Sequence, residues 1–317
     1  MPEPELLGMR NTTTVDRRLA HKESTEQVFI NDVARDGETL VALGELPRSH
    51  RFFNDSAIPR YDALLLAEFI RQGVEVIAHA LLDVPLTSQF VLRSVELELV
   101  DRQATVIGDR AMPVVVALPA SQVRRNRGGM AYAATGPVYC FIDGRPAARF
   151  GGKVGFLACD TYGEIRAAAP LGVPGGSVAA CEPRAVGRQF RENVFIGRPW
   201  GYPRGAKCLV VPRPHPAFFD RPLDHYPGMM LAEAARQLAA SSLAADAHVP
   251  ISSVCTDYAA MDFVSFAELD TSPTLTVVDW IDLDDGAELT VTARQGARTM
   301  STYTFRMFHD DYSEDRS

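Results

Sequence analysis

The sequence predicts an α+β fold built from two tandem copies of one unit, each an antiparallel sheet wrapped around a central helix. Residues 47–72 recur as residues 212–237 at a gapless offset of 165, and 11 of the 26 paired positions are identical. Unrelated segments would share about one or two. Strand-like runs flank one apolar helix in each half. The period is far longer than that of solenoid repeats, so each copy is expected to be a whole domain.

Both halves follow the same order of elements: two short strands, one helix, and about four strands. In the first half we expect strands at 26–30 and 38–43, a helix at 61–82, and strands at 92–100, 112–118, 131–142 and 147–157. In the second we expect strands at 192–196 and 206–211, a helix at about 227–247, and strands at 260–269, 274–283, 288–293 and 299–308. The first helix is apolar on most sides, which predicts burial. This organisation is that of a hotdog fold, so two copies predict a double hotdog.

The chain length of 317 residues agrees with two domains. A stretch rich in Ala, Gly and Pro separates the two copies and is typical of a connection. The predicted organisation is a leader at 1–20, a first hotdog repeat at 21–165, a linker at 166–190, a second repeat at 191–310 and a tail at 311–317.

Composition limits which classes of partner and which cellular compartment we expect. The formal net charge of −8 argues against nucleic acid as a general partner. The five cysteines form no C-x-x-C pair, which argues against a disulfide framework or a zinc site and favours a reducing cytosol. No signal-peptide pattern is visible at the N-terminus, and no apolar run approaches the ~20 residues that span a membrane. We therefore expect a cytoplasmic location, with no metal, membrane or nucleic acid involved.

The first group of candidate functional residues is a polar stripe on each central helix. One reading is a solvent-facing edge with an i,i+3 Glu–Arg pair, worth a few tenths of a kcal/mol. The other is a functional carboxylate, because burial among apolar residues raises its pKa while the arginine lowers it, and such opposed influences concentrate at functional sites. Both copies keep Glu, Arg and Gln while the apolar residues between them differ, which favours a function. The stripes are Glu68, Arg71 and Gln72, and Glu233, Arg236 and Gln237.

The second group is the run from Asp224 to Gly228 at the entrance of the second helix. A proline at an early helical position is typical of a helix N-terminus. The first-turn N–H groups then point at whatever binds there, and they would stabilise the oxyanion of a reacting thioester. His225 is either a helix cap or a functional group. The first copy has Arg60 and Ala63 at the positions of His225 and Gly228, so the two entrances differ chemically.

The third group is the motif Pro-Arg-x-His, which occurs in both copies before aromatic residues. Its members are Arg48 and His50 in the first copy and Arg213 and His215 in the second. The arginines suit a phosphate, since a guanidinium offers a planar fork of donors. The alternative is a turn with a hydrogen-bonded histidine, and the sequence leaves both open.

A fourth group is the basic run Arg124-Arg125-Asn126-Arg127-Gly128-Gly129. On an acidic protein such a loop is either a solvated surface or a docking point for an acidic carrier protein, since complementary charge mainly speeds encounter.

Taken together, these residues resemble the AfsA-type A-factor biosynthesis hotdog family. The resemblance spans roughly residues 20–310, and its most specific part is residues 224–237. It implies an acyltransferase that needs no cofactor. The acyl donor would be a β-ketoacyl thioester of acyl carrier protein, or of CoA, and the acceptor would be the free hydroxyl of dihydroxyacetone phosphate. The ester then leads to γ-butyrolactone or butenolide signals. The resemblance further implies that Glu68, Glu233 and Arg236 matter.

Two departures from the pattern are visible. In the related dehydratases the His-x-Pro-Gly motif lies further from the helix glutamate, whereas here His225 precedes Glu233 by only eight residues. This disfavours dehydratase chemistry. Leu46 stands where a Trp commonly precedes the first Pro-Arg.

The resulting hypothesis is direct acyl transfer with one dominant site on the second helix. Helix N–H groups near Gly228 polarise the thioester carbonyl, Glu233 or Glu68 accepts the alcohol proton, and arginines hold the phosphate. A thioesterase or dehydratase, or a non-catalytic module that binds an acyl chain or lactone, is the alternative. We expect catalytic roles for Glu233, Glu68, Arg236 and His225, and substrate binding by Arg71, Gly228, Arg48, Arg213, His50, His215 and Gln237.

Overall fold

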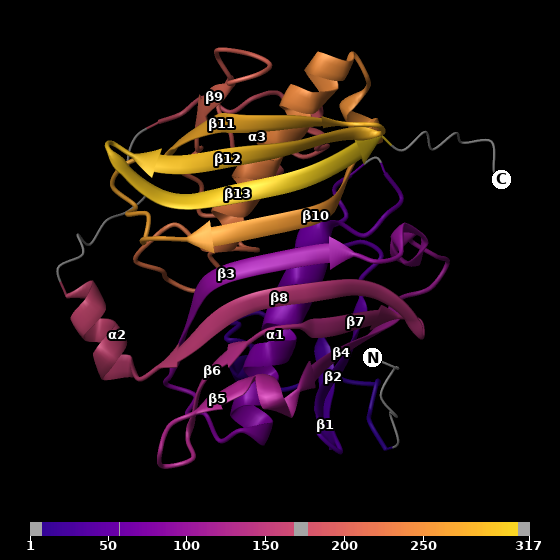
Figure 1. Ribbon diagram of the computed structural model, residues 1–317, viewed down its shortest axis with the longest axis vertical. Coiled ribbons are helices and arrows are strands. Elements are labelled where there is room, and N and C mark those ends of the chain that lie inside the picture. Colours follow the sequence, from indigo (N-terminus) through magenta and orange to yellow (C-terminus); the bar gives the residue numbers. More distant parts are fainter. Residues whose placement is uncertain (1–7, 57, 168–176, 310–317) are drawn as a thin grey trace. The chain divides into compact units, whose positions relative to one another are not determined.

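The computed structural model describes residues 8–56, 58–167 and 177–309 (Figure 1). The chain forms two compact units, the first from Met1–His50 and Arg60–Ala169, the second from Arg51–Pro59 and Pro170–Ser317. A short segment of the first sequence repeat, Arg51–Pro59, thus belongs to the second unit. The start of the predicted leader (1–7), the predicted tail (311–317) and residues 168–176 of the predicted linker lie outside the described residues.

The first unit packs an antiparallel sheet against α1 (Ala63–Leu81), and Figure 1 shows β8 and β3 crossing in front of this helix. The sheet order is β1-β2-β4-β7-β8-β3. A small hairpin of β5 and β6 joins the sheet through β8. The strands are β1 (Ile30–Asp36), β2 (Thr39–Leu46), β3 (Gln89–Leu99), β4 (Met112–Pro119), β5 (Val123–Arg125), β6 (Ala131–Thr135), β7 (Val138–Ile142) and β8 (Arg145–Leu157). A short helix, α2 (Cys159–Arg166), follows β8.

The second unit repeats this plan around α3 (Gly228–Ala247), which packs against β10, β11, β12 and β13. The sheet order is β10-β13-β12-β11-β9. The strands are β9 (Lys207–Leu209), β10 (Val254–Phe263), β11 (Thr274–Leu283), β12 (Gly286–Gln295) and β13 (Arg298–His309). Each unit is therefore one antiparallel sheet on one central helix, and the predicted α+β double hotdog is confirmed.

Four expected strands differ from the structure. The strand expected at 260–269 begins earlier and ends at Phe263, as β10 (Val254–Phe263). The expected strand at 131–142 is two strands, because Gly136, with a φ of 99°, breaks it before Pro137. The expected strands at 26–30 and 192–196 both begin instead as 3₁₀ turns, Thr25–Gln27 and Arg191–Asn193. A glutamine on each central helix explains the turns, since its side chain takes hydrogen bonds that a neighbouring strand would otherwise take.

These glutamines are Gln72 on α1 and Gln237 on α3. The Gln72 amide accepts from the Phe29 N–H at 3.0 Å and donates to the Gln27 carbonyl at 2.8 Å. The Gln237 amide accepts from the Phe195 N–H at 2.9 Å and donates to the Asn193 carbonyl at 2.7 Å. Each helix thus fastens the segment that leads into its own sheet. Among the described residues, no helix is both long and apolar enough to cross a membrane.

Candidate active site

Glu233, on α3, is the centre of a buried charge network in the second unit. Its side chain is fully buried. Oε1 accepts from Arg188 Nη2 at 2.7 Å, Arg236 Nη2 at 2.9 Å and Gln237 Nε2 at 2.7 Å. Oε2 accepts from Arg236 Nε at 2.8 Å. Two guanidinium groups and one amide therefore hold a single carboxylate in place.

The environment of Glu233 keeps it ionised. Burial raises the pKa of this carboxyl group, but the charges and hydrogen bonds of Arg188 and Arg236 outweigh burial and lower the pKa to about 2. A group with so low a pKa is a poor proton acceptor near neutral pH. The geometry suits Glu233 to orienting the two arginines.

Arg188 connects this network to the segment Arg51–Pro59. Its Nη1 donates to the carbonyls of Phe52 at 3.0 Å and Asp55 at 3.2 Å, and its guanidinium lies 4.8 Å from the Phe52 ring centroid. Only 1% of the Arg188 side chain is exposed. A buried arginine is tolerable only when it is paired and hydrogen-bonded in this way.

The entrance of α3 places an imidazole beside an uncapped helix end. His225 Nδ1 lies 2.6 Å from Asp224 Oδ1, and the ring packs edge-on against Phe266. Pro227 is the N-cap residue and offers no side-chain hydrogen bond to the helix. The N–H groups of Gly228 and Met229 precede the first helical hydrogen bond, which Met230 donates to Pro227 at 3.0 Å. Such N–H groups favour an anion or a developing oxyanion.

The first unit carries a related network around Glu68 on α1. Glu68 Oε1 lies 2.9 Å from Lys22 Nζ and 2.8 Å from Arg71 Nη2, and Oε2 accepts from Arg71 Nε at 2.8 Å. Arg71 also pairs with Glu75. Burial opposes the charged form of Glu68, but Arg71 and Lys22 hold its pKa well below the usual range. The same carboxylates raise the pKa of Arg71 against the effect of burial.

The two helix entrances differ as the sequence indicated. In α1 the N-cap residue is Asp62, whose Oδ1 accepts from the Leu64 N–H at 2.8 Å. Leu64 and Met229 are equivalent at the repeat offset of 165. The α1 entrance is therefore occupied by the protein's own carboxylate, whereas the α3 entrance has no side-chain cap.

A family model described as the A-factor biosynthesis hotdog domain matches residues 8–157 and 175–309. The chain belongs to this A-factor biosynthesis hotdog family. Two curated relatives carry the name 2-oxo-3-(phosphooxy)propyl 3-oxoalkanoate synthase. That of Streptomyces virginiae is 31% identical over 242 residues, covering 72% of this chain and 76% of its own. That of Streptomyces coelicolor is 29% identical over 267 residues, covering 81% and 79%.

Solved structures support the fold. The dehydratase domain of PpsC from Mycobacterium tuberculosis, in complex with C12:1-CoA, has a TM-score of 0.52 at 13% identity, covering 88% of this chain and 98% of its own. The dehydratase domain from the CurK module of curacin polyketide synthase has a TM-score of 0.50 at 11% identity, covering 90% and 97%. At these identities the likeness concerns the fold alone. The family model and the curated relatives confirm the predicted family and the assignment as an acyl-transfer enzyme. The solved structures confirm the fold class.

Within this A-factor biosynthesis hotdog protein, the predicted site residues of the two central helices form one group in each unit. In the second unit, Glu233 accepts hydrogen bonds from both Arg236 and Gln237, while His225 and Gly228 lie at the entrance of the same helix. In the first unit, Glu68 and Arg71 form the equivalent pair. The structure describes no cluster of three or more His, Cys, Asp or Glu side chains that would suit a metal ion.

The Pro-Arg-x-His motifs are divided between surface and core. His215 is buried; Ala217 donates its N–H to Nδ1 at 3.1 Å, so Nε2 carries the proton and donates to Asn193 Oδ1 at 2.9 Å. Both ring nitrogens are thus used within the protein, as in the turn alternative. Arg213 donates to the Arg191 carbonyl at 2.8 Å.

The first-copy members of this motif are Arg48 and His50. Arg48 is exposed, and His50 packs edge-on against Phe29. Burial lowers the pKa of His50, with smaller influences from Glu26, Lys22 and Glu68. The lowered pKa favours a neutral imidazole, which is less suited to holding a phosphate than a cation would be.

Sequence reasoning missed the two cations Lys22 and Arg188, which bind the helix glutamates. They are equivalent at an offset of 166, the offset that also pairs Glu26 with Glu192. Residues 26–30 and 192–196 share the motif Glu-x-Val-Phe-Ile, and extending that pairing backwards would have found a cation in both copies. Arg188 fell within the predicted linker 166–190, but it lies in the second unit.

Proposed function

We propose that this protein transfers a β-ketoacyl group from a thioester, carried by acyl carrier protein or CoA, to the free hydroxyl of dihydroxyacetone phosphate. The curated relatives are named for an ester of a 3-oxoalkanoic acid with a 2-oxo-3-(phosphooxy)propyl alcohol. That alcohol is dihydroxyacetone phosphate. The observation that carries the proposal is the entrance of α3, where an Asp–His pair stands beside an uncapped helix N-terminus.

The helix entrance supplies the site for the thioester carbonyl. Attack on a thioester places negative charge on the carbonyl oxygen, and donors fixed in advance at that position lower the barrier. The first-turn N–H groups of Gly228 and Met229 are such donors. Gly228 also allows the Phe263 ring to pack closely against the start of the helix, because a Cβ at this position would lie 2.6 Å from that ring.

His225 is the proton acceptor in this proposal. Its Nδ1–H donates to the Asp224 carboxylate, which fixes the tautomer and leaves the Nε2 lone pair to accept the proton of the acceptor hydroxyl. The hydroxyl oxygen then attacks the thioester carbon, and the tetrahedral intermediate expels the thiolate. The proton held by His225 passes to that thiolate, so the enzyme returns to its starting state without an acyl-enzyme.

Arg236 is the proposed partner of the acceptor's phosphate, with Arg213 as a second candidate. The Arg236 side chain keeps 13% of its surface exposed, whereas its partner Glu233 has none. Glu233 then acts as a positioning residue that fixes the guanidinium plane, aided by Arg188 and Gln237. In this proposal Glu233 orients Arg236 instead of accepting the hydroxyl proton, since two arginines hold the pKa of its carboxyl group well below the usual range.

In this proposal the polar network of the first unit has a structural role, and that unit holds no second reaction centre. Asp62 occupies the N–H group that an oxyanion would need. Arg71 is shared by two carboxylates, Glu68 and Glu75, whereas on α3 Ala240 stands at the position of Glu75. A negatively charged phosphate is therefore less favourable beside Arg71 than beside Arg236.

The decisive experiment incubates the protein with a β-ketoacyl thioester and dihydroxyacetone phosphate and detects the phosphorylated ester by mass spectrometry. Ester formed only with both substrates supports the proposal. Free β-keto acid without the acceptor would instead indicate a thioesterase. An enoyl product from a β-hydroxyacyl thioester would indicate a dehydratase.

The role of His225 has its own test. His225→Gln should lower kcat by about 10²-fold or more, the usual contribution of a general base. Asp224→Asn should lower it less, because the imidazole remains while its orientation is lost. His50→Gln in the first unit is the matched control and should leave kcat unchanged. Equal effects of His225→Gln and His50→Gln would remove His225 from the role of base.

A further inference from the structure

The β5–β6 hairpin of the first unit presents a compact basic surface that the proposed chemistry does not use. We call it the basic hairpin and define it by Arg124, Arg125, Arg127, Met130 and Tyr132. All five residues are exposed, and Met130 and Tyr132 have exposed fractions of 55% and 48%. Large apolar side chains exposed among arginines indicate a contact surface, because a surface that only faces water does not require them.

Hydrogen bonds within the hairpin hold its turn and two of its arginines. Asn126 Oδ1 accepts from the N–H groups of Gly128 at 2.9 Å and Met130 at 3.1 Å. Arg125 Nη1 donates to the Gly129 carbonyl at 2.7 Å, and Arg124 Nε donates to Thr135 Oγ1 at 3.0 Å. Because these bonds hold the turn and two of its arginines, a partner would meet a surface that loses little conformational freedom on binding.

The charge of the basic hairpin contrasts with that of the whole chain. No Asp or Glu occurs from residue 111 to residue 142, although the chain has a net charge of −8. Thr135, which accepts the hydrogen bond from Arg124, pairs with Lys153 of β8, so a further cation lies on the strand next to the hairpin. A negatively charged partner would therefore be repelled by the chain as a whole and attracted at this place.

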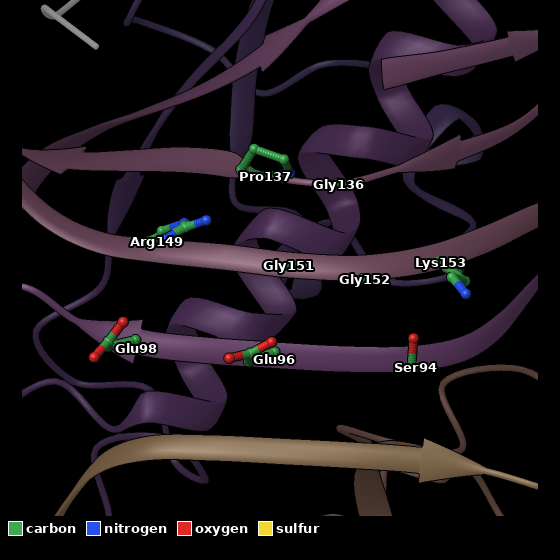
Figure 2. A pocket seen from close by; sticks show the side chains of 9 residues that line it. All are labelled: Ser94, Glu96, Glu98, Gly136, Pro137, Arg149, Gly151, Gly152 and Lys153. Carbon is green, nitrogen blue, oxygen red and sulfur yellow. The ribbon is translucent and has the colours of Figure 1, made fainter.

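A hollow of about 350 Å³ adjoins the basic hairpin on the same sheet (Figure 2). It forms beside Lys153 because Gly136, Gly151 and Gly152 bear no side chains. Figure 2 shows Glu96 and Glu98 on β3, along the opposite side of the hollow from Gly136. These carboxylates limit the basic area on that side, so an acidic partner would sit towards the hairpin.

We propose that the basic hairpin is the docking surface for an acidic carrier protein that brings the acyl thioester. This inference rests on the proposed function, since it assigns a delivery route to the same donor. Arg, Met and Tyr are the side chains enriched at protein–protein interfaces, and Lys, Asp and Glu are depleted there. The hairpin follows that composition, which favours a protein over a nucleic acid or an anionic lipid surface.

The test compares two donors of the same β-ketoacyl group: one on a recombinant stand-alone holo-acyl carrier protein, the other on a short pantetheine thioester. The combined variant Arg124→Glu, Arg125→Glu, Arg127→Glu should raise the KM for the carrier-bound donor about tenfold or more, because reversed charges slow encounter. Its kcat, and both constants for the short thioester, should stay unchanged. The single variant Arg127→Glu has Arg35→Glu as its matched control, since Arg35 is an exposed arginine of the same unit.

Calorimetric binding of the unacylated holo-carrier to the full-length protein provides a readout without turnover. Wild type should bind, with an affinity that falls as salt rises, and the combined variant should bind at least about tenfold more weakly. Equal binding by both proteins overturns the docking surface even if the ester forms. Weakened binding without any ester supports the docking surface while the proposed reaction fails. Tighter binding of a DNA duplex or of anionic lipid vesicles than of the carrier also overturns the inference.

Discussion

At the scale of single residues, Arg188 decides how the second unit holds its charges. It is almost fully buried, and it bonds Glu233 and two backbone carbonyls at once. Without Arg188, Glu233 would depend on Arg236 alone for neutralisation. Removing one partner of a buried ion pair is costly because it leaves an uncompensated charge, although replacing both partners by apolar groups need not be.

Arg188→Met should therefore lower the free energy of unfolding by about 3–5 kcal/mol, the usual cost of breaking a buried pair. Arg188→Lys should cost less, because Lys22 makes the equivalent contact with Glu68 in the first unit. Chemical denaturation measures both values. Arg191→Met is the control: this exposed pair with Glu182 at 3.3 Å should be worth under about 1 kcal/mol. Equal losses for Arg188→Met and Arg191→Met would refute the structural importance of Arg188.

The low pKa of Glu233 predicts a specific dependence of stability on pH. The pKa falls from an ordinary 4.5 to about 2 on folding, so the stabilisation is complete above pH 4.5 and is lost as pH falls towards 2. Unfolding free energies of wild type and Glu233→Gln, measured across this window, should converge as pH falls. Glu233→Gln starts less stable because it leaves two arginines without their carboxylate. Parallel curves would show that Glu233 does not have this depressed pKa.

At the scale of elements, the two helix entrances predict opposite responses to a change of cap. Pro227→Asp gives α3 the carboxylate cap that Asp62 gives α1, and Asp62→Ala removes that cap from α1. Pro227→Asp should keep or raise stability but suppress ester formation, because the new carboxylate competes for the first-turn N–H groups. Asp62→Ala should cost about 1 kcal/mol of stability and leave turnover intact. Thermal melts and the product assay on both variants check this, and an active Pro227→Asp would contradict the assigned oxyanion site.

The sequence predicts an element well when a regular residue pattern reveals it. It predicts an element poorly when distant side chains take the hydrogen bonds of that segment. The helices and most strands were predictable, because long apolar or alternating runs reveal them directly. The 3₁₀ turns Thr25–Gln27 and Arg191–Asn193 were not, because their bonds are made with glutamines more than 40 residues away. Glu233, Arg236 and His225 could be singled out from the repeat and the helix entrance. The relation of Glu233 to Arg188 needed the three-dimensional structure, since distance in space decides which charges neutralise one another.

At the scale of the whole molecule, sequence repeats and structural units do not share boundaries. The segment Arg51–Pro59 lies in the first repeat but belongs to the second unit. Asp55 fastens it there: its carboxylate accepts from the Gln189 N–H at 2.9 Å, the Phe190 N–H at 3.1 Å and Asn193 Nδ2 at 2.7 Å. The same segment supplies the carbonyls that hold Arg188, so the network around Glu233 depends on a piece of the other repeat.

This dependence predicts that a change in the first repeat loosens the second unit. Asp55→Ala should cost about 2–3 kcal/mol, because it leaves the buried Asn193 amide and two backbone N–H groups without their shared acceptor. Hydrogen–deuterium exchange should rise at Gln189 and Phe190, whose N–H groups donate to Asp55, and stay unchanged at β2 and β4 of the first unit. Ser56→Ala, the neighbouring control, should change neither region. Faster exchange confined to β2 and β4 would mean that the segment serves its own repeat, and the proposed dependence of the Glu233 network on it would be wrong.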